Sequence, residues 1–313
     1  MRKEITIVLI TLIVVAGCSG CISQEGYKES EELTIKFGVM PDEATLPYYV
    51  ADEEGLFTNH GLNVVIVPFM SAMERDAALT AGGIDAGEND PVGALLLRNA
   101  GYDVKIVSLE LQETADKMRF AIIASPQSNI SSVEDLDGRE IAISSNTIIE
   151  YITDALLGDV QSKKIEVKKV PIRMQMLLDN EIDAATLPEP LASYAVHKGA
   201  NLVISDAMLN RSVSQTVIVF NGDFIEKHPE SVDTFLDAYS EAVSRINANP
   251  EIYRTLLVEK TRIPEEIAAD YKIATYLPPQ SYPEDKYAEV LQWMQSKDLV
   301  QHEISYDDTV LKQ

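Results

Sequence analysis

LTIKFGV at residues 33–39 begins an alternation that runs through most of the chain. PYYVADEE follows at 47–54, NVVIVP at 63–68 and AMERDAALTA at 72–81. Short apolar runs with β character thus alternate with amphipathic stretches of helical period. This alternation is typical of an α/β fold with a mostly parallel sheet.

The same rhythm continues and then begins again near Phe120. Further strands are predicted at 84–86, 104–109, 120–124, 140–144, 165–170, 184–186 and 216–220, and further helices at 91–100, 133–136, 148–157, 172–179 and 230–247. Because the two half-chains have matching patterns, we expect two similar lobes. Pro250 and Pro264 are predicted to open additional helices near the C-terminus.

Composition narrows the function. The chain has 313 residues, enough for two domains of about 150 residues each. Fifty acidic residues against 26 Lys and Arg give a net charge of −24, which repels phosphate backbones and argues against nucleic acid as a partner. The four histidines lack metal-ligand spacing, and no nucleotide-binding or nucleophile-elbow motif occurs. We therefore expect no metal, no cofactor and no catalytic residue.

The N-terminus predicts export and lipid anchoring. Arg2 and Lys3 precede an apolar run at 5–16 that is shorter than the roughly 20 residues a membrane span needs. VAGC at 15–18 resembles the lipobox of lipoprotein precursors, which makes Cys18 the expected lipidation site, with Cys21 as the weaker candidate. The alternatives are an uncleaved anchor or an ordinary signal peptide. We expect a signal peptide at 1–17 and a lipid anchor and tether at 18–33.

Both cysteines lie in this leader region, so the predicted folded part has no disulfide and no cysteine metal site.

Two polar turns follow predicted strands and begin predicted helices. Ser71 fits the capping pattern S-x-x-E with Glu74. Ser145 and Asn146 lie in SSNT at 144–147, which holds more small polar residues than one cap requires. Ligands of open α/β sheets lie beyond the carboxyl ends of the strands, where helix N-termini offer amide donors. Each turn is therefore a candidate ligand contact, and capping alone is the alternative.

Arg75 is one of few cations near a predicted strand end in this acidic chain. Its planar guanidinium suits a bound carboxylate or sulfonate. The alternative is an intramolecular pair with Glu74, Asp76 or Asp90.

An ordered series of short motifs carries a family resemblance. The series comprises FGV at 37–39, LPYYVA at 46–51, EGLF at 54–57, HGLNV at 60–64, ALTAGGIDA at 78–86, LDGREIA at 136–142 and LPEPLA at 187–192. It resembles solute-binding proteins of the nitrate/sulfonate/taurine and thiamin-pyrimidine group, which serve ATP-driven (ABC) importers.

The resemblance implies an α/β, two-lobed periplasmic-binding-protein-like (type II) fold with two crossover hinge strands and C-terminal helices. Lobe one would comprise 34–120 plus 213–313 and lobe two 121–212, with hinge strands at 118–124 and 214–220. The carried-over ligand-binding positions are Asp42, Leu46, Ser71, Asp90, Ser145, Asn146 and Glu189. For Glu189 the alternative is a hinge or permease-facing role.

The expected function is that of a monomeric, lipid-anchored extracytoplasmic receptor. It would capture a small polar solute, similar to a sulfonate, taurine, nitrate or a pyrimidine thiamin precursor, and deliver it to an ABC permease in the membrane. One alternative is a sensory or scaffold lipoprotein of the same fold. The other is an enzyme of pyrimidine synthesis, although the cysteine-rich motif of that branch is missing here.

Overall fold

The computed structural model describes residues 33–312, and Leu33–Gln313 forms one compact unit. The predicted signal peptide, Cys18, Cys21 and nearly all of the predicted tether lie outside the described residues. Within the described range, no helix combines the length and apolar character that crossing a bilayer requires.

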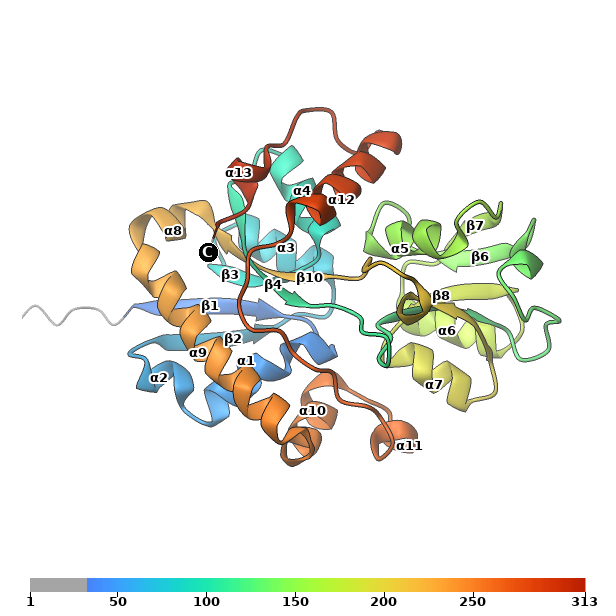
Figure 1. Cartoon of the computed structure of the whole chain (residues 1–313), viewed down its shortest axis with the longest axis horizontal. Coiled ribbons are helices and arrows are strands. Elements are labelled where there is room, and N and C mark those ends of the chain that lie inside the picture. The colour runs from blue at the N-terminus through green and yellow to red at the C-terminus, as the bar shows by residue number, and fades with distance from the viewer. Residues whose placement is uncertain (1–32, 313) are drawn as a thin grey trace, which may run out of the picture. The chain divides into compact units, whose positions relative to one another are not determined.

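Two five-stranded mixed sheets form the framework (Figure 1). The first has the order β2-β1-β3-β10-β4 and the second β7-β6-β8-β5-β9. Strands of the first sheet are β1 Thr34–Val39, β2 Asn63–Pro68, β3 Ala86–Asn89, β4 Val104–Leu111 and β10 Thr216–Asn221. Strands of the second are β5 Phe120–Ala124, β6 Glu140–Ile143, β7 Lys163–Glu166, β8 Ala184–Pro188 and β9 Asn201–Ser205.

The two sheets repeat one plan. In each, three parallel strands are followed by one strand antiparallel to its neighbours, β10 in the first sheet and β5 in the second. These strands follow the two segments that cross between the sheets, 112–119 and 206–215 (Figure 1). The chain therefore enters and leaves the second sheet once each, as in a two-lobed type II binding-protein fold.

Alternating side chains place β1 and β10 in the core of the first lobe. Phe37 of β1 packs on Tyr48 and Phe235, with ring centroids 4.3 and 5.1 Å apart. Along β10, Ile218 and Phe220 face this aromatic core, and Val217 and Val219 face a second core on the opposite side. A strand buried on both faces has the continuous apolar sequence seen at 217–220.

The helices cover both sheets. Those around the first sheet are α1 Leu46–Glu53, α2 Leu56–Asn59, α3 Ala72–Thr80, α4 Pro91–Asn99, α8 Gly222–Lys227, α9 Pro229–Ala248, α10 Arg254–Thr261, α11 Glu265–Ala268, α12 Glu284–Ser296 and α13 Tyr306–Thr309. The second sheet has α5 Ile148–Leu157, α6 Val170–Leu178 and α7 Leu191–His197. The 3₁₀ turns are η1 Glu43–Thr45, η2 Glu134–Leu136, η3 Asp206–Met208 and η4 Pro250–Tyr253.

Two predicted strands were misplaced. The predicted strand at 84–86 is wrong, because Ile84 is a buried loop residue and β3 covers Ala86–Asn89. Its Gly87 lies so close to β1 that a Cβ atom would be 2.8 Å from the Gly38 carbonyl oxygen, so glycine is required inside the strand.

The predicted strand at 165–170 is also wrong, since β7 covers Lys163–Glu166 and Val170 already begins α6. Pro171 lies in the first helical turn, where its missing N–H does no harm.

The two crossing segments are tied together by buried carboxylates. Asp206 accepts hydrogen bonds from the backbone N–H groups of Arg119 (3.0 Å) and Phe120 (2.8 Å) and from the Ser214 hydroxyl. Glu113, on the other segment, accepts from the backbone N–H of Val213 at 2.7 Å and from the Ser212 hydroxyl at 3.0 Å. Each segment thus supplies one carboxylate that satisfies donors of the other segment.

Removing the Asp206 carboxylate should destabilise the protein strongly. In Asp206→Ala the backbone donors of Arg119 and Phe120 lose their acceptor, so we expect the free energy of unfolding to fall by about 3 kcal/mol. Ser214→Ala removes only one donor and should lose about 1 kcal/mol. Urea unfolding of both variants measures this difference, and equal losses would contradict a central role for Asp206.

Candidate functional site

Charged side chains from both sheets gather beside the crossing segments. Asp42 and Glu43 follow the carboxyl end of β1, Glu88 lies in β3, Glu110 in β4, and Glu189 directly follows β8. Lys117 and Arg119 come from the segment between β4 and β5. We call these seven residues the buried charge cluster, because all except the half-buried Asp42 are at most 8% exposed.

Tyrosines and backbone groups hold two of the carboxylates in place. Tyr48 donates its hydroxyl to Glu110 Oε1, and Tyr239 donates to the Glu110 carbonyl oxygen at 3.4 Å. The backbone N–H of Met40 donates to Glu88 Oε1 at 2.5 Å. In both carboxylates one oxygen is engaged in this way, while Oε2 of Glu88 and Oε2 of Glu110 have no hydrogen-bond partner among the described residues.

Glu43 joins the two lobes. Its Oε2 accepts from the Tyr271 hydroxyl at 2.9 Å and pairs with Lys117 Nζ at 3.3 Å. Lys117 also lies 3.9 Å from Glu189 Oε2 and 3.8 Å from the Tyr271 ring centroid. Because Glu189 follows β8 of the second sheet, Lys117 links carboxylates from both lobes. Glu43 Oε1 finds no hydrogen-bond partner within residues 33–312.

Arg119 is the unusual member of the cluster. Its side chain is 6% exposed, yet Nε and Nη1 make no hydrogen bond to any described residue. Burial by itself lowers the pKa of Arg119, but the charges of Glu43, Asp42 and Glu110 raise it above its ordinary value. The guanidinium therefore stays charged among carboxylates without a direct partner, which is an expensive arrangement unless something completes it.

Four carboxyl groups of the cluster, those of Asp42, Glu88, Glu110 and Glu189, have raised pKa values. Burial raises the pKa of Glu110 to about 8 and that of Glu189 to about 7, the latter against the opposing charge of Lys117. Burial also raises the pKa of Glu88 well above its usual range, and the neighbouring Asp42 and Glu110 add to this rise. For Asp42 burial raises the pKa, and Arg119 partly offsets the rise.

These raised values predict that the protein without a bound solute is more stable in mild acid. A carboxyl group whose pKa is raised on folding contributes stability that is fully present below its unfolded pKa, near 4.3, and is lost as the pH rises through the folded value. For Glu189 and Glu110 the loss falls near pH 7 and pH 8. We expect the free energy of unfolding in urea to be larger at about pH 5.5 than at about pH 8.5, by roughly 2 kcal/mol or more.

Glu189→Gln provides the matched control. It should remove the step near pH 7 and leave the step near pH 8. If the free energy of unfolding of the unchanged protein rises from about pH 5.5 to about pH 8.5, the expected protonation of these carboxyl groups is wrong.

The structure places Ser71, Arg75 and Asp90 beyond the carboxyl ends of β2 and β3 in the first sheet. Ser71 caps α3 by accepting from the Glu74 N–H at 3.3 Å, and Asp90 caps α4 by accepting from the Gly93 N–H at 2.8 Å. Arg75 donates to Asp76 at 2.8 Å and to Asn89 at 2.7 Å, which is one of the intramolecular pairings considered from the sequence. Its charge still reaches Asp42 and Asp90, so it borders the cluster.

The remaining predicted positions lie elsewhere. Leu46 is fully buried in the aromatic core of the first lobe. Ser145 donates from its backbone N–H and its hydroxyl to Glu166, and the N–H of Asn146 donates to Glu150 at 2.8 Å. Both residues are exposed at the start of α5. Asp42 and Glu189 are the predicted residues that belong to the cluster itself, and a ligand role for all eight stays a prediction.

Sequence reasoning missed most of the cluster, namely Glu43, Glu88, Glu110, Lys117 and Arg119. The available signal was the presence of glutamates inside or directly after strands that are otherwise apolar. Within residues 33–312, no group of three or more His, Cys, Asp or Glu side chains has the arrangement of a metal site.

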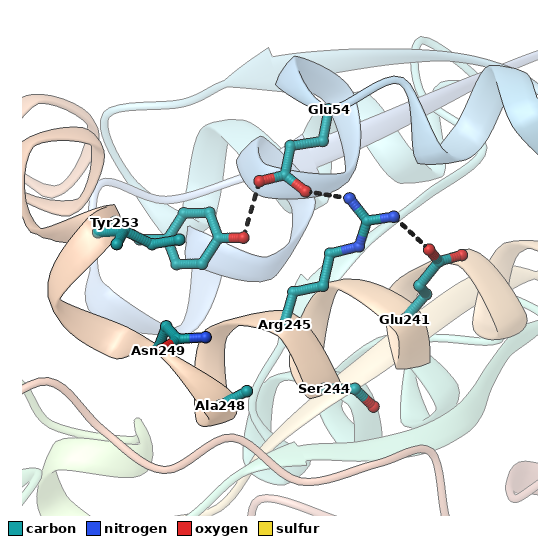
Figure 2. A pocket seen from close by; sticks show the side chains of 8 residues that line it. Glu54, Glu241, Ser244, Arg245, Ala248, Asn249 and Tyr253 are labelled. Atoms are coloured by element: carbon teal, nitrogen blue, oxygen red, sulfur yellow. Dashed lines mark hydrogen bonds and ion pairs between the residues drawn. The ribbon is translucent and has the colours of Figure 1, made fainter.

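A separate pocket of about 510 Å³ lies beside Glu54, at the C-terminal end of α1 (Figure 2). Glu43 of the buried charge cluster precedes the other end of this helix. Glu54, which follows α1, accepts from Tyr253 at 2.7 Å and pairs with Arg245, and Arg245 also pairs with Glu241 at 2.5 Å. Here each charged group drawn has its counterpart (Figure 2). This pocket is therefore a satisfied surface network, in contrast to the unpaired Arg119.

Comparison with known proteins identifies the fold class first. The periplasmic aliphatic sulphonate binding protein SsuA of Escherichia coli superposes with a TM-score of 0.74 at 18% identity, over 87% of this chain and 94% of that chain. The desulfurization enzyme DSZB shares the fold as well, with a TM-score of 0.65 at 15% identity over 88% of this chain and 95% of its own. The two-lobed periplasmic-binding-protein fold is thus confirmed, and this fold serves both binding proteins and an enzyme.

The family follows from the sequence itself. The family model described as NMT1/THI5 like matches residues 43–252, more than half of the chain, so this chain belongs to the NMT1/THI5-like family. A Brachyspira hyodysenteriae protein that bears the name of an ABC transporter periplasmic binding protein is 24% identical over 80% of this chain and 77% of its own length. A Brucella abortus binding protein is 27% identical over 64% of this chain, and the match spans 63% of that relative's length. The resemblance inferred from the sequence motifs is confirmed.

Proposed function

We propose that this protein is an extracytoplasmic, lipid-anchored receptor of an ABC importer. It captures a small polar solute at the buried charge cluster and delivers it to a membrane permease. Support comes from the family, from the name carried by the Brachyspira relative and from the fold shared with sulfonate-binding proteins. The family resemblance suggests sulfonates, taurine, nitrate or pyrimidine thiamin precursors as the solute classes to consider.

The unpaired Arg119 guanidinium is the single observation that carries this proposal. A buried donor without an acceptor costs about 1–3 kcal/mol, and more when it is charged. Arg119 Nε and Nη1 and the free oxygens of Glu43, Glu88 and Glu110 all lie in one cluster. A bound polar molecule would satisfy these atoms together, which explains why the protein retains them.

The position of the cluster suits capture by closure. Its members come from both sheets and from the segment 112–119 that connects them. We propose lobe boundaries at 34–120 plus 213–313 and at 121–212, with the crossing segments as the hinge. Binding-protein folds close by rotation about such connecting segments. A solute held by Glu88 on one side and Glu189 on the other would therefore stabilise the closed form.

Binding and its dependence on Arg119 can be tested with a matched pair of variants. We expect the full-length chain in mild detergent to gain thermal stability from a small-molecule extract of the producing organism, since a ligand at about 100 times its Kd adds roughly 2.7 kcal/mol. Arg119→Gln should lose this gain, whereas Arg245→Gln, which changes the surface pocket, should keep it. Differential scanning fluorimetry measures the shift, and denaturing mass spectrometry identifies the bound compound.

Equal shifts in both variants would remove Arg119 from the site. No shift for the unchanged chain, together with no co-purified compound, would overturn the receptor proposal.

Anchoring is tested at the two cysteines. With Cys18 as the lipidated residue, Cys18→Ser should abolish incorporation of a labelled fatty acid and release the protein from the membrane fraction. Cys21→Ser should leave both properties unchanged. The reverse pattern would move the anchor to Cys21, and labelling of neither protein would favour an ordinary signal peptide or an uncleaved anchor.

A further inference from the structure

We propose that the two lobes rotate about the junction of α12 with α5, so that the buried charge cluster opens on the opposite side, where α11 meets α7. Figure 1 shows these two contacts on opposite sides of the crossing segments, α12 with α5 at the top and α11 with α7 at the bottom. This inference rests on the proposed receptor function for the purpose of the motion, which is to admit a solute. It adds the direction of opening and the contacts that break.

The apolar cores of the two lobes are continuous on the α12 side. One buried cluster contains Val290 and Met294 of α12 together with Ile149 and Ile152 of α5, and it includes strand residues of both sheets. Val290, Met294 and Ile152 are fully buried. Separating the lobes here would expose apolar side chains to water, at a cost that grows with the exposed area. The lobes therefore stay together on this side.

Aromatic and charged contacts reinforce the same junction. Trp293 of α12 packs edge-on against Tyr151 of α5, with ring centroids 5.4 Å apart, and its indole N–H donates to Asp154 at 3.0 Å. Lys297 Nζ lies 2.8 Å from Asp154 and 3.2 Å from Glu150. These pairs are backed by aromatic packing and by an apolar core, so they are harder to separate than solvated pairs. The junction is suited to act as the axis of a rotation.

The cores are separate on the α11 side. One buried cluster surrounds β1 and α9 in the first lobe, and another lies between α7 and the second sheet. The half-buried Tyr194 of α7 packs against both clusters, and its hydroxyl donates to Glu266 of α11 at 3.1 Å. Lys198 pairs with the same carboxylate at 3.1 Å, and the side chains of this pair are 38% and 48% exposed. Exposed ion pairs exchange with water at little net cost, so this side can open.

The buried charge cluster lies between these two separate cores. Glu43 accepts a hydrogen bond from Tyr271, which belongs to the core of the first lobe. Glu189 follows Leu187 of β8, which belongs to the core of the second lobe. Lys117 joins the two sides by pairing with Glu43 at 3.3 Å and with Glu189 at 3.9 Å. Rotation about the α12 junction separates polar groups here, and water or a solute replaces their contacts.

Two distances test the axis. The full-length chain is prepared in mild detergent with both native cysteines replaced by serine, and exhaustive dialysis removes bound compounds. One sample carries spin labels at Val196→Cys and Glu265→Cys, which define the α11-side distance. The other carries them at Asp159→Cys and Gln292→Cys, which define the α12-side distance. All four positions are exposed, and electron–electron double resonance gives the distribution of each distance.

We expect the α11-side distance to be broad without a solute. A small-molecule extract of the producing organism should narrow it and shorten its mean by roughly 2 Å or more, the scale of a domain rearrangement. The α12-side distance should be narrow and unchanged in both samples. Trp293 is the only tryptophan of the chain and reads the junction without labels, so its emission should stay constant while its contact with Asp154 persists.

Equal widths of the two distributions, or movement of the α12-side distance, would overturn the proposed axis. If the extract moves neither distance while the α11-side distribution remains the broader one, the receptor function is overturned and the axis stands.

Ion-pair variants separate the two sides by different readouts. Lys198→Gln removes the exposed pair with Glu266 and should broaden the α11-side distance without changing the midpoint of urea unfolding. Asp154→Asn weakens the α12 junction and should lower that midpoint without changing the α11-side distance. Lys260→Gln is the control, because Lys260 pairs with Glu53 within the first lobe at 3.8 Å and should affect neither readout. Broadening of the α11-side distance by Asp154→Asn but not by Lys198→Gln would overturn the proposal.

Discussion

The Asp206 carboxylate accepts hydrogen bonds from both segments that connect the sheets, and the site depends on this arrangement. One of its donors is the backbone N–H of Arg119, so the same interaction that joins the segments also fixes where the Arg119 side chain begins. Glu113, on the opposite segment, likewise accepts a hydrogen bond across the crossing, from the backbone N–H of Val213. The backbone crosses between the lobes only at these two segments, so their buried hydrogen bonds help to set the spacing between β3 and β8, and hence between Glu88 and Glu189. Contacts such as that of Lys297 with Asp154 at 2.8 Å also join the lobes.

The buried charge cluster differs from the rest of the protein interior in its hydrogen bonding. Buried polar groups normally find partners, and the apolar cores beneath β1 and β10 follow that rule. Oxygens of Glu43, Glu88 and Glu110 and two nitrogens of Arg119 do not. Raised pKa values reduce the cost for Glu88 and Glu110, because burial favours the neutral forms of these two groups. A guanidinium has no such option at physiological pH, so the unpaired nitrogens of Arg119 mark an incomplete site.

Much of the fold was predictable from the sequence, because local patterns determined it. NVVIVP at 63–68 and the helix at 148–157 are found at the predicted bounds, since apolar period and capping residues act over a few positions. The predictions at 84–86 and 165–170 were wrong where close backbone approach and a helical proline prevailed over apolar character.

The site was harder to predict than the fold. Glu88 and Glu110 are charged residues within strands, and only the sheet order shows that β3 and β4 flank β10 and turn these side chains toward Tyr48 and Asp42. Arg119 lies between two strands in a stretch without a motif, so nothing local distinguishes it from a solvated arginine. Contacts between residues far apart in sequence, such as Tyr271 with Glu43, have no signature in either segment alone.

Because the chain leaves the first sheet and returns to it with β10, the strand order also determines which of the two sheets can fold first. β10 lies between β3 and β4, so the first sheet has a gap in its middle until residues 216–221 are available. The second sheet needs only 120–205, a continuous segment, and can be finished earlier. The half of the protein that is synthesised first is therefore assembled last, through contacts of long sequence separation that form slowly. In a chain that leaves the ribosome from its N-terminus, the unpaired edges of β3 and β4 are the surfaces that need shielding for the longest time.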